Sequence, residues 1–161
     1  MQTRYLSLIG FLTCAFLLGL AYYFQYGRGM EPCPLCIFQR LAFFGLALTF
    51  LVSAIRNASG LELKFYNVLG FASGLFGVAI AARHVWLQNL PADQVPECGP
   101  GLEFMWQAFP FQKFLETVLK GSGECAEVSW SMLGLTMPGW SLVWLVILTA
   151  LTLFLLFRRH S

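Results

Sequence analysis

The sequence predicts an all-α membrane protein, a bundle of four transmembrane helices with one long outer loop. Of its 161 residues, 58% are hydrophobic and only 11% are charged, and the mean hydropathy is +0.68. A soluble domain carries about 25% charged residues. The apolar residues gather into four separate stretches, each close in length to the ~20 residues that a helix needs to cross a bilayer. We therefore expect a single integral membrane domain over residues 1–161.

The first and last apolar stretches are the strongest candidates for spans. Residues 6–24 and 138–157 contain 19 and 20 residues without a charge, enough for a helix across a ~30 Å hydrocarbon layer. Because Arg4 precedes the first stretch, a cleaved signal sequence is the alternative. The stretch is long for a signal peptide, and GLAYYFQYG is a poor cleavage site. We expect both stretches to be membrane helices.

The two middle stretches carry polar residues near their outer ends. Residues 37–55 are long enough to span only if Gln39 and Arg40 lie at the level of the lipid headgroups. Residues 65–87 reach His84 and a preceding arginine shortly before they end. We expect both stretches to span the membrane, which gives four spans and brings the two termini to one side.

Positive charges are concentrated in the short segments on one side of the predicted bundle. The termini and the turn between the second and third spans hold Arg4, Arg56, Lys64, Arg158 and Arg159. The two longer connections, residues 25–36 and 88–137, hold only Arg28, Lys113 and Lys120. The positive-inside rule therefore predicts cytoplasmic termini and puts both connections outside, in the periplasm if the membrane is a bacterial inner membrane. The longer connection has six acidic residues against two lysines, so no nucleic-acid partner is expected.

The connection over residues 88–137 is long enough to have a function of its own. Within it, Phe111, Phe114, Leu115 and Val118 follow the i, i+3, i+4, i+7 spacing of one apolar helix face. Such a short amphipathic helix would lie on the membrane surface. Packing against the bundle is the alternative.

Four of the five cysteines fall in the predicted periplasmic connections, where disulfides persist: Cys33, Cys36, Cys98 and Cys125. Cys14 lies inside the first span, and we expect it to be an apolar packing residue without chemistry. Two structural bridges are one interpretation, and a Cys98–Cys125 bridge would stabilise the fold by about 3.5 kcal/mol. A Cys33–Cys36 bridge closes too short a loop to stabilise much, and a strained, accessible disulfide is easily reduced. The close pair therefore favours redox chemistry.

Zinc bound by the same thiols is a third interpretation. However, Cys98 and Cys125 do not form the second close pair of a four-cysteine site, and no histidine lies near either in the sequence. We therefore expect no metal.

The close pair lies at a predicted helix start. Pro32 and Pro34 favour an extended approach followed by helix initiation. Cys33 then lies near the N-cap of the second span, where the helix dipole and free N–H groups favour a thiolate. If the helix continues, Cys33, Cys36 and Arg40 stand at i, i+3 and i+7 and share one face.

Arg40 has two interpretations. It can mark the membrane interface by extending its charge toward water, or its guanidinium can stabilise negative charge that develops on an acceptor dissolved in the membrane. A periplasmic thiol pair needs an electron acceptor, and the two-electron oxidant available in lipid is a quinone. His84 could stand at a similar depth, in an interface role or a redox role.

Five motifs carry a resemblance to a known family: CPLCIFQR (33–40), RHVWLQNLP (83–91), ECGPGLEF (97–104), SGECAE (122–127) and LGLTMPGW (133–140). With these motifs the chain resembles, over essentially its whole length, the DsbB family of disulfide bond formation proteins of the bacterial inner membrane. The resemblance implies a four-helix thiol oxidase that reoxidises a DsbA-like partner with a thioredoxin fold. It also implies ubiquinone or menaquinone as the electron acceptor.

The resemblance further implies a role for each candidate residue. Cys98 would form the mixed disulfide with the partner, and Cys125 would then pass the reducing equivalents to Cys33. The quinone site would be made by the remaining three residues, with Cys36 facing the quinone as a thiolate, Arg40 beside the ring and His84 assisting.

Two other functions stay open at this point. One is a non-catalytic four-span scaffold or transporter with two structural disulfides. The other is a quinone reductase of the vitamin K epoxide reductase type, although that family usually carries its CxxC pair late in the chain.

Overall fold

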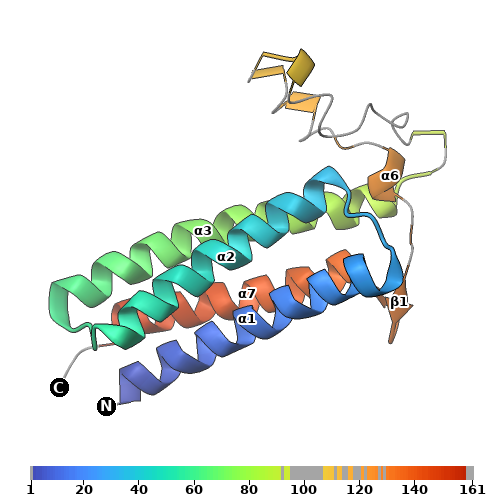
Figure 1. The fold of residues 1–161 in the computed structure, drawn as a ribbon. Helices are drawn as coiled ribbons and strands as arrows, with labels where there is room; N and C mark the ends of the chain where they lie inside the picture. Colours follow the sequence, from blue (N-terminus) through green and yellow to red (C-terminus); the bar gives the residue numbers. More distant parts are fainter. Residues whose placement is uncertain are drawn as a thin grey trace.

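The computed structural model describes residues 2–91, 93–94, 107–110, 112–113, 116–117, 121, 123–126, 128 and 130–158. Four long helices run along the molecule (Figure 1): α1 (Gln2–Arg28), α2 (Pro34–Ile55), α3 (Gly60–Gln88) and α7 (Met137–Phe157). All four are long and apolar enough to cross a membrane. The predicted fold class, an all-α protein with four membrane-spanning helices, is confirmed.

The other described elements are short and lie between α3 and α7. They are the single helical turn α6 (Gly123–Ala126) and a two-stranded antiparallel hairpin of β1 (Ser131–Met132) and β2 (Leu135–Thr136). The predicted amphipathic helix depends on residues outside the described part of the chain: Phe111, Phe114, Leu115 and Val118.

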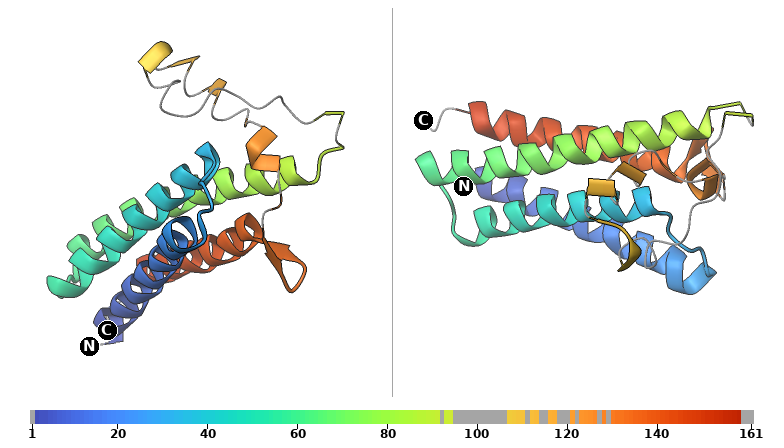
Figure 2. Two further views of the ribbon diagram at one scale, coloured as in Figure 1. Left: turned by 45° about the vertical axis from the view of Figure 1, so that its right-hand side comes forward. Right: turned by 90° about the horizontal axis from the view of Figure 1, so that it is seen from above.

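Neighbouring helices in the sequence are neighbours in space. Helix α1 packs on α2, α2 on α3 and α3 on α7, whereas α1 and α7 make few contacts with each other. The start of α1 and the end of α7 lie at one end of the bundle, and α6 and the hairpin lie at the other (Figures 1 and 2). The bundle therefore has one loosely closed side, between α1 and α7.

The helices extend past the apolar stretches that predict them. Helix α1 continues to Arg28, and α3 begins at Gly60, several residues before its uncharged core. Polar residues at a helix end can lie among the headgroups while the backbone keeps its internal hydrogen bonds. Hydropathy therefore defines the apolar centre of each span better than its ends.

The centre of the bundle is apolar and includes the fifth cysteine. Cys14 is fully buried, in a cluster with Ala42, Leu46 and Leu145. This confirms the prediction that Cys14 is a packing residue. Large apolar side chains such as Phe44, 61% exposed, cover the outside of the helices, as expected for a surface that faces lipid.

Small residues on α3 allow the helices to approach closely. A Cβ atom on Gly77 would lie 2.7 Å from the Ala42 Cβ and 2.8 Å from the Leu145 Cδ2. One turn earlier, a Cβ on Gly74 would meet the side chain of Thr149. Close helix contacts at small residues are typical of membrane bundles. Helix α3 therefore contacts both α2 and α7 through its glycines.

We predict that Gly77→Ala destabilises the bundle by about 1–2 kcal/mol, because overpacking outweighs the gain in helix propensity. Gly19→Ala on α1 is the matched control, since a Cβ there has nothing within 4 Å. The control should be neutral or stabilising by up to ~1 kcal/mol. The free energy of unfolding in detergent, from a denaturant titration, checks both, and equal effects would contradict this account of the packing.

Candidate thiol redox site

The site begins at the first turn of α2, as the prolines predict. Cys33 is the N-cap residue, with extended backbone angles (φ −66°, ψ 162°), and Pro34 occupies the start of the helix. The Cys33 sulfur accepts a hydrogen bond from the Cys36 backbone N–H at 3.4 Å. The two sulfurs are 3.1 Å apart, with Cys33 Sγ donating to Cys36 Sγ. Both side chains are thiols in contact.

The loop brings a third cysteine to this pair. Helix α6 holds Cys125, which is fully buried, and its sulfur lies within 4.8 Å of the Cys33 sulfur. Cys125 packs in a small apolar cluster with Leu35, Ile80 and Leu87. Three of the four predicted redox cysteines are therefore together, and Cys98 lies outside the described residues.

The protonation of Cys33 differs from the sequence prediction. Hydrogen bonding with the Cys125 and Cys36 thiols, followed by burial, raises the pKa of Cys33 above its ordinary value. The prediction of a thiolate at Cys33 considered only the helix N-terminus, and it is wrong because two neighbouring sulfurs and the loss of water favour the protonated form. Cys33 is therefore a donor, and the sulfur that accepts its hydrogen bond is Cys36.

His84 lies between the cysteines in the interior. It is 2% exposed, and its Nδ1 and Nε2 atoms lie 4.0 Å from Cys36 Sγ and 3.8 Å from Cys33 Sγ. The Gln39 amide Nε2 donates to Nδ1 at 3.0 Å, so the ring proton is on Nε2, which donates to the Cys125 carbonyl oxygen at 3.0 Å. His84 therefore contacts Cys125, although the two residues are 41 positions apart in the sequence.

Arg40 is half-buried, and its guanidinium is bonded to α1. Its guanidinium donates to Gln25 Oε1 and, at 3.2 Å, to the Ala21 carbonyl of α1, and it lies over the Tyr22 ring at 5.2 Å. A guanidinium carries five N–H donors, and these two contacts use two of them. Arg83, which precedes His84 on α3, stacks on Trp86 at 4.2 Å.

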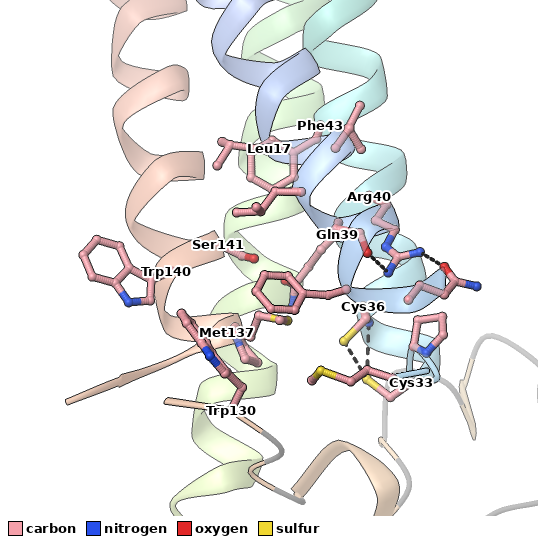
Figure 3. A pocket seen from close by; sticks show the side chains of 18 of the residues that line it. Leu17, Cys33, Cys36, Gln39, Arg40, Phe43, Trp130, Met137, Trp140 and Ser141 are labelled. Carbon is pink, nitrogen blue, oxygen red and sulfur yellow. Dashed lines mark hydrogen bonds between the residues drawn. The ribbon is translucent and has the colours of Figure 1, made fainter. Parts of the chain in front are cut away.

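A cavity of about 350 Å³ adjoins the thiols on the loosely closed side, between α1 and α7. Cys33, Cys36 and Arg40 all line it, so the predicted shared face is confirmed. Figure 3 shows the Cys36 and Arg40 side of the cavity facing Trp130 of the loop and Met137 of α7. Most of the remaining lining is apolar, with Phe16, Leu17, Leu20, Phe24, Phe43 and Trp144. The cavity can hold an apolar molecule with a polar group directed at α2.

The donor atoms of Cys33, His84 and Cys125 lie within 4.8 Å of one another and are buried. Sulfur and imidazole nitrogen are zinc ligands. The same closeness is required for thiol–disulfide exchange, because the attacking sulfur must reach the disulfide. The closeness of Cys33 and Cys125 therefore suits the transfer of a disulfide between them. The expectation that this group of residues binds no metal stays a prediction.

Sequence reasoning missed Gln39 and Gln25, the polar residues that contact the predicted site residues His84 and Arg40. Gln39 entered the sequence analysis only through its expected depth in the membrane, and the structure shows it 4% exposed and bonded to His84. A polar residue in an apolar span is expensive unless it has a partner, and that signal could have identified Gln39. Gln25, which contacts Arg40 from α1, has no such signal because it lies at a helix end.

Four membrane-spanning helices that hold a close cysteine pair between a third cysteine and an apolar cavity define a membrane-embedded thiol oxidoreductase. Comparison with known proteins agrees. The family model "Disulfide bond formation protein DsbB" matches residues 3–155. The chain therefore belongs to the DsbB family, and its role is disulfide bond formation.

Curated relatives support this membership over the full length. "Disulfide bond formation protein B" of Nitrosococcus oceani is 51% identical over 153 residues, which cover 95% of this chain and 90% of the relative. The proteins of the same name from Hahella chejuensis and Marinobacter nauticus are 48% and 44% identical, covering 99% and 100% of this chain and 96% of each relative.

Proposed function

We propose that the protein is a thiol:quinone oxidoreductase that reoxidises a periplasmic DsbA-like partner and delivers the electrons to ubiquinone or menaquinone. The observation that carries this proposal is that the close cysteine pair can be reached from two sides. Both cysteines border the apolar cavity, but Cys33 is buried and lies within 4.8 Å of the loop cysteine Cys125, whereas Cys36 is the more exposed of the two. Electrons can therefore arrive at one sulfur and leave from the other.

In this proposal the relay uses only disulfide exchange. A partner thiolate attacks the Cys98–Cys125 disulfide at Cys98, and the second partner thiol then releases Cys98, which leaves the partner oxidised. The Cys125 thiolate attacks Cys33 in the Cys33–Cys36 disulfide, so a Cys33–Cys125 bond forms and Cys36 leaves as a thiolate. Attack by Cys98 on Cys125 restores the loop disulfide and releases Cys33. The net result is one oxidised partner and a reduced close pair.

The cavity residues suit a quinone. A flat ring and an isoprenoid tail suit apolar and aromatic walls, and a ring oxygen can accept a hydrogen bond from a donor on the wall beside it. Cys36 and Arg40 would hold the ring from α2, and His84 adds a polar group to the same wall. When bound, a quinone supplies an acceptor for two electrons and two protons. Phe43 and Trp144 supply aromatic wall to the cavity, and the Arg40 charge would stabilise negative charge that develops on the acceptor.

The location follows from the charges and the family resemblance. We place the whole chain, residues 1–161, as one domain in the bacterial inner membrane, with cytoplasmic termini and periplasmic thiols. Arg56 and Lys64 flank the turn between α2 and α3, at the bundle end where α1 begins, and the thiols lie at the opposite end (Figure 1). The positive-inside rule then favours this orientation.

The test is an absorption band from the Cys36 thiolate beside a bound quinone. Purified protein with added ubiquinone should develop a band that neither component shows alone, and Cys36→Ser should remove it. A band that persists in Cys36→Ser would contradict the assignment of Cys36, and no band with either quinone would contradict the proposed acceptor site.

A non-catalytic scaffold or transporter makes a different prediction for cells. Its cysteines would stay oxidised whether or not the membrane contains quinone. In the oxidoreductase, thiol alkylation should reveal reduced Cys33 and Cys36 in quinone-depleted membranes and oxidised cysteines in replete ones.

A further inference from the structure

We infer that the last turns of α3 form a docking site for the Cys125 segment, by which we mean Gly121 and the turn α6 (Gly123–Ala126). His84 and Leu87, which we call the seat, position this segment against Cys33. The inference rests on the proposed relay, in which Cys125 must reach Cys33. It assigns His84 a function on the loop side, in addition to its place on the cavity wall. Figure 1 shows α6 beside the end of α3.

The first contact of the seat is a hydrogen bond to the backbone of the cysteine. His84 Nε2 donates to the Cys125 carbonyl oxygen at 3.0 Å, and Gln39 fixes the required tautomer through Nδ1. Because the acceptor is a backbone oxygen, the bond does not depend on whether the Cys125 sulfur is a thiol, a thiolate or part of a disulfide. His84 can therefore hold the segment at every stage of the relay.

The second contact is a close approach of the loop backbone to α3. Gly121 has φ +80°, and a Cβ at this position would collide with Leu87 Cδ1. Leu87 is 1% exposed, and both Gly121 and Gly123 are buried. Only a glycine combines this backbone angle with this approach. The backbone before Cys125 is therefore fitted to the surface of α3.

The two contacts hold the segment at two points, one before the cysteine and one at the cysteine itself. Gly121 lies four residues before Cys125 and rests on Leu87, while the carbonyl of Cys125 itself is bonded to His84. Cys125 also belongs to one buried apolar cluster with Leu35, Ile80 and Leu87. A seat of this kind raises the effective concentration of Cys125 at Cys33.

The step that the seat should favour can be isolated from the rest of the cycle. In a Cys98→Ser protein with the close pair oxidised, the Cys125 thiolate can attack Cys33. The Cys33–Cys125 bond forms, the Cys33–Cys36 bond breaks, and the electron pair leaves on Cys36. This is an isomerisation, so it needs neither quinone nor partner. Quenching, alkylation and mass spectrometry give the ratio of alkylated Cys36 to alkylated Cys125.

The sharpest variant is Gly121→Ala in the Cys98→Ser background, with Gly134→Ala as its matched control. Gly134 has the same φ of +80°, but a Cβ there has nothing within 4 Å. Both variants carry the same backbone strain, and only Gly121→Ala disturbs the seat. We expect Gly121→Ala to lower the fraction of Cys33–Cys125 isomer about tenfold, and Gly134→Ala to leave it unchanged. Adding Leu87→Ala to Gly121→Ala should recover part of the loss, because it makes room for the new methyl group.

The hydrogen bond is tested with two His84 variants. His84→Phe keeps a ring but removes the donor, and should lower the isomer fraction about 3- to 10-fold, the equilibrium effect of one net hydrogen bond. His84→Gln retains an N–H donor near the Nε2 position and should restore most of the fraction. A merely structural role of the imidazole ring would not produce this rescue.

The outcomes separate the seat from the relay. If the Cys98→Ser reference forms no Cys33–Cys125 disulfide, the proposed relay order fails and the seat fails with it. If the reference forms it and Gly121→Ala and His84→Phe form it equally well, the relay stands and the seat is refuted. Equal losses in Gly121→Ala and Gly134→Ala would also refute the seat, since backbone strain alone would then explain them.

Discussion

Replacement of either member of the close pair, Cys33→Ser or Cys36→Ser, is expected to reduce quinone reduction by reduced partner at least about a thousandfold, the scale of loss on removing a reacting nucleophile. A serine oxygen cannot take the place of sulfur in the disulfide, so the step from Cys125 to Cys33 or the step out of Cys36 is lost. The measurement is quinol formation with purified protein, reduced DsbA-like partner and ubiquinone.

Cys14→Ser provides the control for this experiment. Cys14 is fully buried in the core of the bundle, and the relay does not use it. Its variant should turn over within about threefold of the parent, because serine is close to cysteine in size and its hydroxyl can hydrogen-bond to a backbone carbonyl of the preceding helical turn. Unchanged turnover in Cys33→Ser or Cys36→Ser would refute the relay, and an equal loss in Cys14→Ser would attribute the effect to misfolding.

Sequence patterns predicted those features of this protein that are formed by residues close together in the chain. Hydropathy predicted four spans because each helix must satisfy its own backbone in lipid. The prolines predicted the N-cap at Cys33, and helical spacing predicted the face that Cys33, Cys36 and Arg40 share along the cavity. Each of these features depends on residues within one continuous stretch of the chain.

The features that sequence reasoning missed join distant segments. His84 and Cys125 are 41 residues apart in the chain, and Arg40 and Gln25 are joined between two helices. No periodicity within one helix encodes these contacts. The mistaken thiolate at Cys33 has the same origin, because the cause that most raises its pKa is the sulfur of Cys125. The arrangement of the helices in the bundle, which leaves the cavity between α1 and α7, also could not be predicted from patterns within one helix.

Arg40 is the residue for which the structure most changes the expected experiment. Its guanidinium joins α2 to α1 through Gln25 and the Ala21 carbonyl while it lines the cavity. A brace between helices and a quinone ligand would both be lost in Arg40→Ala. The variant alone therefore cannot distinguish them, and the Michaelis constant and the turnover number must be measured separately.

We predict that Arg40→Ala raises the KM for quinone about tenfold or more, the scale of a lost hydrogen bond to a charged group, with a smaller effect on kcat. Arg40→Lys should recover only part of this loss, because an ammonium restores the charge without the planar fork of donors. Steady-state kinetics with varied ubiquinone and saturating partner give both constants.

Gln25→Leu separates the ligand from the brace. It removes the acceptor on α1 but leaves the guanidinium, which the Ala21 carbonyl still holds at 3.2 Å. If Arg40 contacts the quinone, Gln25→Leu should raise the KM clearly less than Arg40→Ala does. If the two variants raise it equally, Arg40 acts by holding α1 beside α2. An unchanged KM in Arg40→Ala, Arg40→Lys and Gln25→Leu would leave only an interface role for the guanidinium, since neither its charge nor its position would then matter to the acceptor.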